Sequence, residues 1–122
     1  MATTRKPEIL DQSIRADAAE YLLYIPATLD YFTGHFPGHP ILPGVTQIHW
    51  VVELSYPLQM QGSFKSMERL KFMRLIVPES RISLALNREV NRNKEADGSI
   101  LNFRYYDPTG NITTGRLSFS AP

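Results

Sequence analysis

Residues 44–60 carry the clearest hydrophobic pattern of this chain, with apolar side chains recurring at spacings of three and four residues. This spacing places them along one face of an α-helix. The face comprises Val45, Ile48, Val51, Val52, Leu54 and Ser55. Pro43 and Gly44 suit a helix start, whereas Pro57 should kink or end the helix because it lacks an amide proton. The pattern predicts one buried helix over residues 44–60.

The chain on either side of this helix has the patterns of strands. Upstream, residues 20–25 are rich in strand-forming side chains and stop at Pro26, and residues 7–16 show a weaker strand pattern. Downstream, strands are expected at residues 67–75, 81–90, 99–106 and 111–120. The segment from Asp107 to Gly110 is a turn sequence, so the last two strands should form a hairpin.

The alternation is clearest in residues 81–90, where Ile82, Leu84 and Leu86 share one face. One buried helix followed by an antiparallel meander predicts an α+β fold, with the sheet wrapped around that helix. The 122 residues suffice for a single domain with one core, and residues 1–6 are expected to be disordered.

Composition narrows the classes of function. A formal net charge of +1 gives no reason to expect a nucleic acid as partner. The absence of cysteine excludes disulfides and thiolate metal sites. No apolar stretch approaches the roughly 20 residues of a membrane span, and no apolar segment follows the N-terminal charges as in a secretory signal. A cytoplasmic protein is therefore expected.

The segment Gly-His-Phe-Pro-Gly-His-Pro-Ile-Leu-Pro-Gly at residues 34–44 directly precedes the predicted helix. Its three prolines restrict the backbone and remove amide donors, and its glycines let another group approach the backbone closely. Its first histidine, His35, can exchange a proton near neutral pH. A stiff loop that carries a histidine and leads into a buried helix predicts a functional site rather than a solvent loop.

This motif, with its three prolines at fixed spacing, resembles the signature of the hot-dog fold 3-hydroxyacyl-acyl-carrier-protein dehydratases of the FabZ type. The segment from Leu70 to Pro78 is similar to the strand that follows the central helix in that family. One position departs from the family pattern, because His49 stands where a glutamate is expected fourteen residues after His35. The run from Gln47 to Trp50 instead resembles the ApeI-like dehydratases of aryl-polyene biosynthesis.

The resemblance implies dehydration of a 3-hydroxyacyl thioester, carried by the phosphopantetheine of an acyl carrier protein, to the trans-2-enoyl thioester. His35 would be the base that removes the α-proton, although a loop histidine can also simply bond a carbonyl. Amides at the helix start, beside Gly44, suit the charge that develops on the thioester oxygen. The reaction requires neither a metal nor an organic cofactor.

His49 has three interpretations: it is the acid that protonates the departing hydroxyl, it orients water or substrate, or it is a core histidine in a subunit that has lost the acid. Glu53 lies one helical turn after His49. It can orient His49 or replace the missing carboxylate, and the simpler interpretation is a solvated or salt-bridged side chain at the helix edge.

Further side chains are expected to contact substrate. They are Phe32, Phe36, Pro43, Val45, Trp50 and Glu53. Trp50 is the least specific of them, because a large aromatic side chain on a buried helix is more often part of the core. His39 is expected to face solvent. Arg69, Lys71 and Arg74 form a basic strand that suits either an acidic carrier protein or plain solvation.

The resemblance also implies a site between two subunits, so the protein should be a homodimer, a higher oligomer, or a hetero-oligomer with a related dehydratase. Two alternative functions follow. One is thioester hydrolysis on the same fold, with Glu53 activating water. The other is a non-catalytic subunit whose partner carries the carboxylate.

Overall fold

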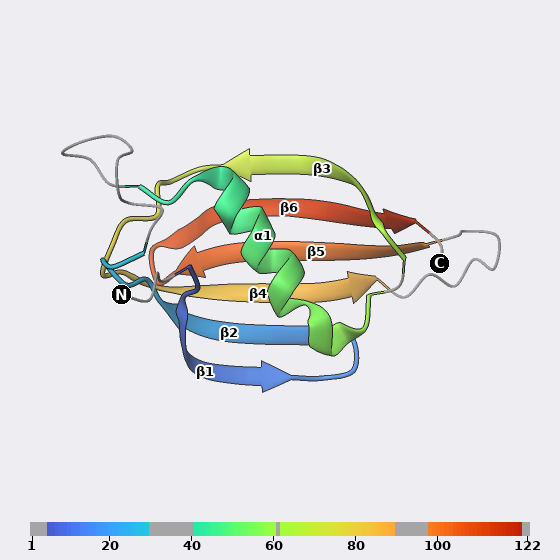
Figure 1. Cartoon of the computed structure of the whole chain (residues 1–122), viewed down its shortest axis with the longest axis horizontal. Coiled ribbons are helices and arrows are strands. Elements are labelled where there is room, and N and C mark those ends of the chain that lie inside the picture. The colour runs from blue at the N-terminus through green and yellow to red at the C-terminus, as the bar shows by residue number, and fades with distance from the viewer. Residues whose placement is uncertain (1–4, 30–40, 61, 90–97, 121–122) are drawn as a thin grey trace.

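The structure, a computed structural model, describes residues 5–29, 41–60, 62–89 and 98–120. Within these residues a six-stranded antiparallel sheet carries helix α1 across one face (Figure 1). The elements are β1 (Glu8–Ile14), β2 (Ala18–Tyr24), α1 (Gly44–Leu54), the short 3-10 helix η2 (Tyr56–Leu58), β3 (Phe64–Phe72), β4 (Arg81–Glu89), β5 (Gly98–Asp107) and β6 (Gly110–Ser120). None of the described helices is long and apolar enough to cross a bilayer.

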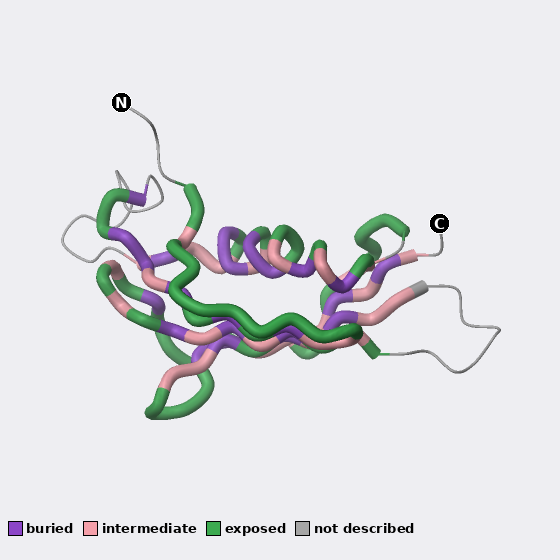
Figure 2. The backbone as a smooth tube through the Cα atoms, turned by 90° about the horizontal axis from the view of Figure 1, so that it is seen from below, coloured by how far each residue is buried: buried purple, intermediate pink, exposed green. Residues whose placement is uncertain are grey.

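The strand order in the sheet is β1-β2-β4-β5-β6-β3, so the strand that follows the helix lies at an edge. β3 pairs with β6, the last of the described strands, while β1 forms the opposite edge and is exposed throughout (Figure 2). The predicted α+β architecture is confirmed, and β4 buries Ile82, Leu84 and Leu86 on one face as expected. β3 begins at Phe64 rather than Met67.

Helix α1 ends at Leu54, short of the expected residue 60. Pro57 lies in η2, which confirms that the helix stops before this proline. The expected buried face is wrong in part. Val51 and Ser55 are buried as predicted, but Val45 is 83% exposed and Val52 is 37% exposed.

The side of α1 that meets the sheet instead carries Thr46, Gln47, Trp50 and Val51. The residues of both helix faces recur at spacings of three and four, so spacing alone does not show which face is buried. The sheet decides the orientation, because it offers hydrogen-bond partners to polar groups of the helix. Burial of a polar residue such as Gln47 is tolerated only where such partners exist.

Two tyrosine hydroxyls hold this orientation. Tyr105 of β5 donates to the carbonyl oxygen of Gln47 at 2.7 Å, and Tyr21 of β2 donates to that of Leu54 at 2.8 Å. The two carbonyls are about two turns apart and lie on the same side of the helix. Burial raises the pKa of Tyr105, so its hydroxyl remains a neutral donor.

Strand β3 contains a bulge. Glu68 pairs with Arg116 and Lys71 with Thr114, so Arg69 and Leu70 together oppose Gly115. Arg69 adopts the left-handed conformation with φ 54°, and Leu70 packs against the core. Gly115 makes room for this packing, because a Cβ at that position would lie 2.6 Å from Cε1 of Phe103 and 3.1 Å from Cδ1 of Leu70.

We expect Gly115→Ala to lower the free energy of unfolding by about 1–3 kcal/mol, because the added methyl group overpacks this contact. Urea unfolding followed by circular dichroism measures the change. Thr114→Ala is the matched control on the same strand, and should change stability by less than about 0.5 kcal/mol. Equal stabilities of the two variants would contradict the packing role of Gly115.

Candidate active site

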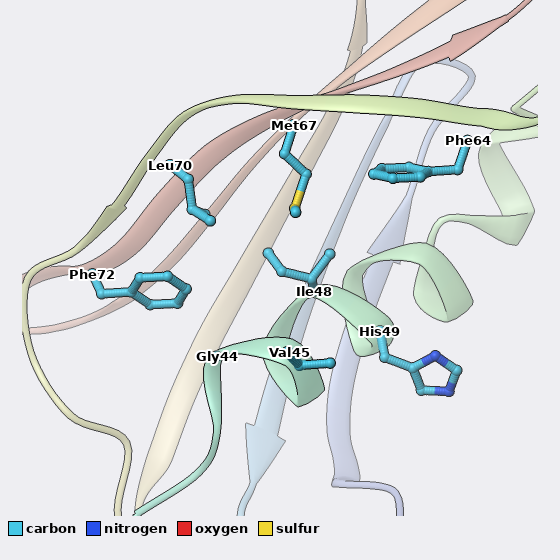
Figure 3. A pocket seen from close by; sticks show the side chains of 8 residues that line it. All are labelled: Gly44, Val45, Ile48, His49, Phe64, Met67, Leu70 and Phe72. Carbon is cyan, nitrogen blue, oxygen red and sulfur yellow. The ribbon is translucent and has the colours of Figure 1, made fainter.

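A cavity of about 510 Å³ lies between helix α1 and strand β3 (Figure 3). The helix contributes Gly44, Val45, Ile48 and His49, and the strand contributes Phe64, Met67, Leu70 and Phe72. In Figure 3, Ile48 and Met67 point toward one another across the cavity, and the imidazole of His49 points away from them. The lining is apolar apart from His49, so the cavity suits a hydrocarbon chain.

The start of α1 opens on this cavity. The first helical hydrogen bond runs from the amide of Gln47 to the carbonyl of Pro43 at 3.2 Å, and no side chain caps the helix. The amides of residues 44–46 therefore have no acceptor within the helix, and they carry the positive end of its dipole. Pro43 itself is extended, with φ −61° and ψ 147°.

The ring of Phe72 lies directly against Gly44. A Cβ on Gly44 would be 2.7 Å from Cζ of Phe72, so only glycine leaves space for this ring. In the structure the group beside Gly44 is the Phe72 ring, and the approach of a thioester to Gly44 stays a prediction. The ring is half exposed, at 50%.

His49 and Glu53 are in contact one helical turn apart. Nε2 of His49 lies 2.5 Å from Oε1 of Glu53, and the side chains are 60% and 37% exposed. This contact fits both a Glu53 that orients His49 and the simpler salt-bridged side chain at the helix edge, so the role of Glu53 stays a prediction. Because His49 is exposed on the cavity side of the helix, it is not a buried core histidine in this chain.

The other expected site residues fall into two groups. Val45 lines the cavity, whereas Trp50 is 1% exposed and packs in the core, where its Nε1 donates to the carbonyl of Arg5 at 3.0 Å. Trp50 thus packs on the sheet side of α1 as a core residue, which was the simpler interpretation, and it does not line this cavity. His35, Phe32, Phe36 and His39 lie outside the described residues.

The basic residues around β3 do not form one patch. Arg74 binds the carboxylate of Asp107 through two hydrogen bonds of 3.0 and 2.7 Å and donates to the carbonyl of Gly110 at 2.6 Å. Hydrogen bonds from Arg74 and Thr109 hold the pKa of Asp107 well below its usual range. Arg74 thus fastens the β5–β6 turn, while Arg69 and Lys71 line a separate groove beside Arg104, Asn102 and Arg116.

The sequence analysis assigned no role to the β3 side chains that form one wall of the cavity. They are Phe64, Met67, Leu70 and Phe72. The sequence signal that could have identified them is the presence of large apolar side chains in a strand that is otherwise rich in charged residues. Two register shifts, between Phe64 and Ser66 and between Glu68 and Lys71, break the two-residue period of strands. The alternation that would have placed these side chains on one face is therefore missing from the sequence.

Comparisons with known proteins agree with this geometry. The model of the ApeI-like family, described as ApeI dehydratase, matches residues 11–116. In solved structures, a chain of the dehydratase heterocomplex ApeI:P from Xenorhabdus doucetiae superimposes with a TM-score of 0.79 and 33% sequence identity, over 94% of this chain and 98% of that one. A hypothetical thioesterase from Streptococcus pneumoniae, solved with coenzyme A, has a TM-score of 0.67 at 9% identity and shows the shared fold alone.

Curated relatives are dehydratases of the FabZ type. The 3-hydroxyacyl-[acyl-carrier-protein] dehydratase FabZ of Granulibacter bethesdensis is 27% identical over 118 residues, which cover 88% of this chain and 66% of that protein. FabZ of Moorella thermoacetica is 44% identical over 57 residues, which cover 39% of each. The chain therefore spans less than two thirds of the length of these relatives.

Proposed function

This chain belongs to the ApeI-like family of hot-dog dehydratases, and we propose that it dehydrates a 3-hydroxyacyl thioester on acyl carrier protein to the trans-2-enoyl thioester. The resemblance to FabZ-type and ApeI-like proteins, expected from the motif at residues 34–44, is confirmed by the family match. The observation that carries the proposal is the apolar cavity that begins at the free amides of α1 and ends beside His49.

In the proposed reaction the acyl chain lies between α1 and β3, against Ile48, Met67 and Leu70. The thioester oxygen meets the amides at the helix start after the Phe72 ring has rotated away from Gly44. Developing negative charge on that oxygen is stabilised by fixed amide donors and by the helix dipole. Apolar walls exclude water and strengthen these interactions.

Two histidines divide the proton transfers. Neutral His35 takes the proton from the α-carbon, the bond between the β-carbon and its hydroxyl breaks, and protonated His49 gives a proton to the departing hydroxide to form water. The contact between Nε2 of His49 and Oε1 of Glu53 supports this assignment, because it leaves Nδ1 as the imidazole atom available to the substrate.

A second subunit fits the exposed apolar surface next to the cavity. β3 pairs with β6 on one side only within the described chain, and large apolar side chains beside it are exposed. They are Val45, Tyr56, Phe64, Met67, Phe72, Met73, Leu75 and Val77. An unpaired edge strand with such a surface is a site of protein association. We propose that a second hot-dog subunit, either a copy of this chain or a related dehydratase, covers it.

The heteromeric alternative has an observation in its favour, since the structural relative at 33% identity is a chain of a dehydratase heterocomplex. Thioester hydrolysis has none, because Glu53 is engaged with His49 and the likeness to a thioesterase shows only the fold.

We expect His35→Ala to lower turnover of a 3-hydroxyacyl carrier protein by roughly 10²–10⁴-fold, because the general base is lost. Formation of the enoyl thioester, followed by mass spectrometry of the carrier, measures the rate. His39→Ala is the control within the same sequence motif and should leave turnover near that of the unmodified protein. Undiminished turnover in His35→Ala would remove His35 from the mechanism.

His49→Ala should lower kcat by roughly 10²-fold or more if His49 is the acid, with a smaller loss in Glu53→Gln, which keeps the shape but not the charge. The assay is run on this protein alone and after mixing with a related FabZ-type dehydratase. Activity that appears only in the mixture and persists with His49→Ala would assign the acid to the partner.

Met67→Glu should convert the oligomer to a monomer, because it places a charge in the proposed interface. Sedimentation velocity measures the oligomeric state. Lys71→Glu is the matched control on the same strand, because Lys71 lies beside the separate basic groove. Retention of the oligomer in Met67→Glu, or its loss in Lys71→Glu, would contradict an interface on the cavity side of β3.

A further inference from the structure

We propose that Gln47 is a positioning residue, which holds the first turn of α1 in the orientation that directs its free amides into the cavity. The inference rests on the proposed dehydration. Gln47 is 3% exposed and is the most deeply buried polar residue of α1. It lies on the sheet side of α1 and does not line the cavity.

Besides its amide bond to Pro43, three hydrogen bonds to residues outside the helix converge on Gln47. Its Nε2 donates to the carbonyl of Leu42 at 3.4 Å, and its Oε1 accepts from Oγ1 of Thr113 at 2.7 Å. Its backbone carbonyl accepts from the hydroxyl of Tyr105 at 2.7 Å. Gln47 therefore joins the segment before the helix to β5 and β6.

The segment before the helix is held on its other side as well. The amide of Leu42 donates to the carbonyl of Ile76 at 2.8 Å, and Leu42 is 3% exposed. Its position is thus set by one bond to the chain after β3 and one bond to Gln47. Because Pro43 and Gly44 follow directly, these bonds also determine where the helix begins.

Stability alone does not account for a glutamine here. Burying a primary amide is unfavourable unless its hydrogen bonds are satisfied, and an apolar side chain of similar size would fill the space without that requirement. A hydrogen-bonded amide, unlike an apolar side chain, allows one rotation of the helix about its axis. Val45 lies roughly opposite Gln47 on the helix, so that rotation determines how the cavity side of the first turn faces β3.

The catalytic consequence concerns kcat. Negative charge on the thioester oxygen develops in the transition state, so amides that are slightly misdirected weaken transition-state binding more than substrate binding. A variant that disturbs Gln47 should therefore lower kcat with little change in KM. A purely structural role would lower the melting temperature and leave the turnover of folded protein unchanged.

Gln47→Glu is the decisive variant because it keeps the shape and retains an acceptor for Thr113. When its carboxyl group is protonated it can donate to the Leu42 carbonyl, and when ionised it cannot. Burial should raise the pKa of this carboxyl. Among the described residues, Tyr105 is the titratable group in contact with this position, and burial raises its pKa, so it stays neutral below pH 9.

The experiment measures kcat of Gln47→Glu relative to the unmodified protein between pH 5 and 9, a ratio that cancels the ionisations common to both. We expect a ratio near one at low pH that falls by about tenfold to hundredfold as the carboxyl ionises. Gln47→Leu, which has no ionisable group, should give a low ratio that does not vary with pH. Melting temperatures are recorded at each pH.

A kcat ratio near one at every pH, together with an unimpaired kcat in Gln47→Leu, would overturn the inference. A loss of kcat that only follows a fall in melting temperature would also overturn it. The amide nitrogen and proton shifts of residues 44–46 in Gln47→Glu give a readout independent of turnover and should titrate with the same midpoint. If these shifts titrate in Gln47→Glu but the unmodified protein does not dehydrate the substrate, the proposed function is overturned and the positioning role of Gln47 is kept. Constant shifts would overturn the positioning role.

Discussion

The rotation of α1 about its own axis determines which side chains of the helix face the cavity and strand β3. Two tyrosine hydroxyls, from Tyr105 and Tyr21, bind helix carbonyls about two turns apart and leave one rotation that satisfies both. With that rotation set, Gly44 meets Phe72 and His49 faces away from the sheet. The hydrogen bonds are individually modest, at about 1 kcal/mol each, but together they orient the whole helix.

The distribution of side chains on α1 departs in part from that of a surface helix. Trp50 and Val51 face the sheet as usual, but polar Thr46 and Gln47 are buried beside them, while Val45 and Val52 are exposed. A surface helix normally turns such polar side chains to solvent and such apolar ones to the core. The exposed Val45 agrees with an outward side that serves the cavity and the proposed partner, and it joins the apolar surface that continues onto β3.

The sequence predicted the architecture well and the cavity only in part. The motif at residues 34–44 identified the family through the spacing of its prolines and histidine, and Pro57 correctly marked the end of the helix. The burial of Gln47 was not predictable, because its partners on β5 and β6 lie far away in the chain and strand pairing is not visible in local spacing. The wall formed by Met67 and Leu70 was hidden for a related reason, since the bulge opposite Gly115 removes the alternation.

The position of β3 also constrains how the chain is made. This strand precedes β4 and β5 in the sequence, yet its partner in the sheet is β6, which is synthesised after both of them. Until β6 is made, the apolar side chains of β3 have no neighbouring strand, and distant pairings of this kind form slowly and expose surfaces prone to aggregation. Synthesis of the proposed partner subunit nearby, at the same time, would shorten the interval during which this strand stands uncovered.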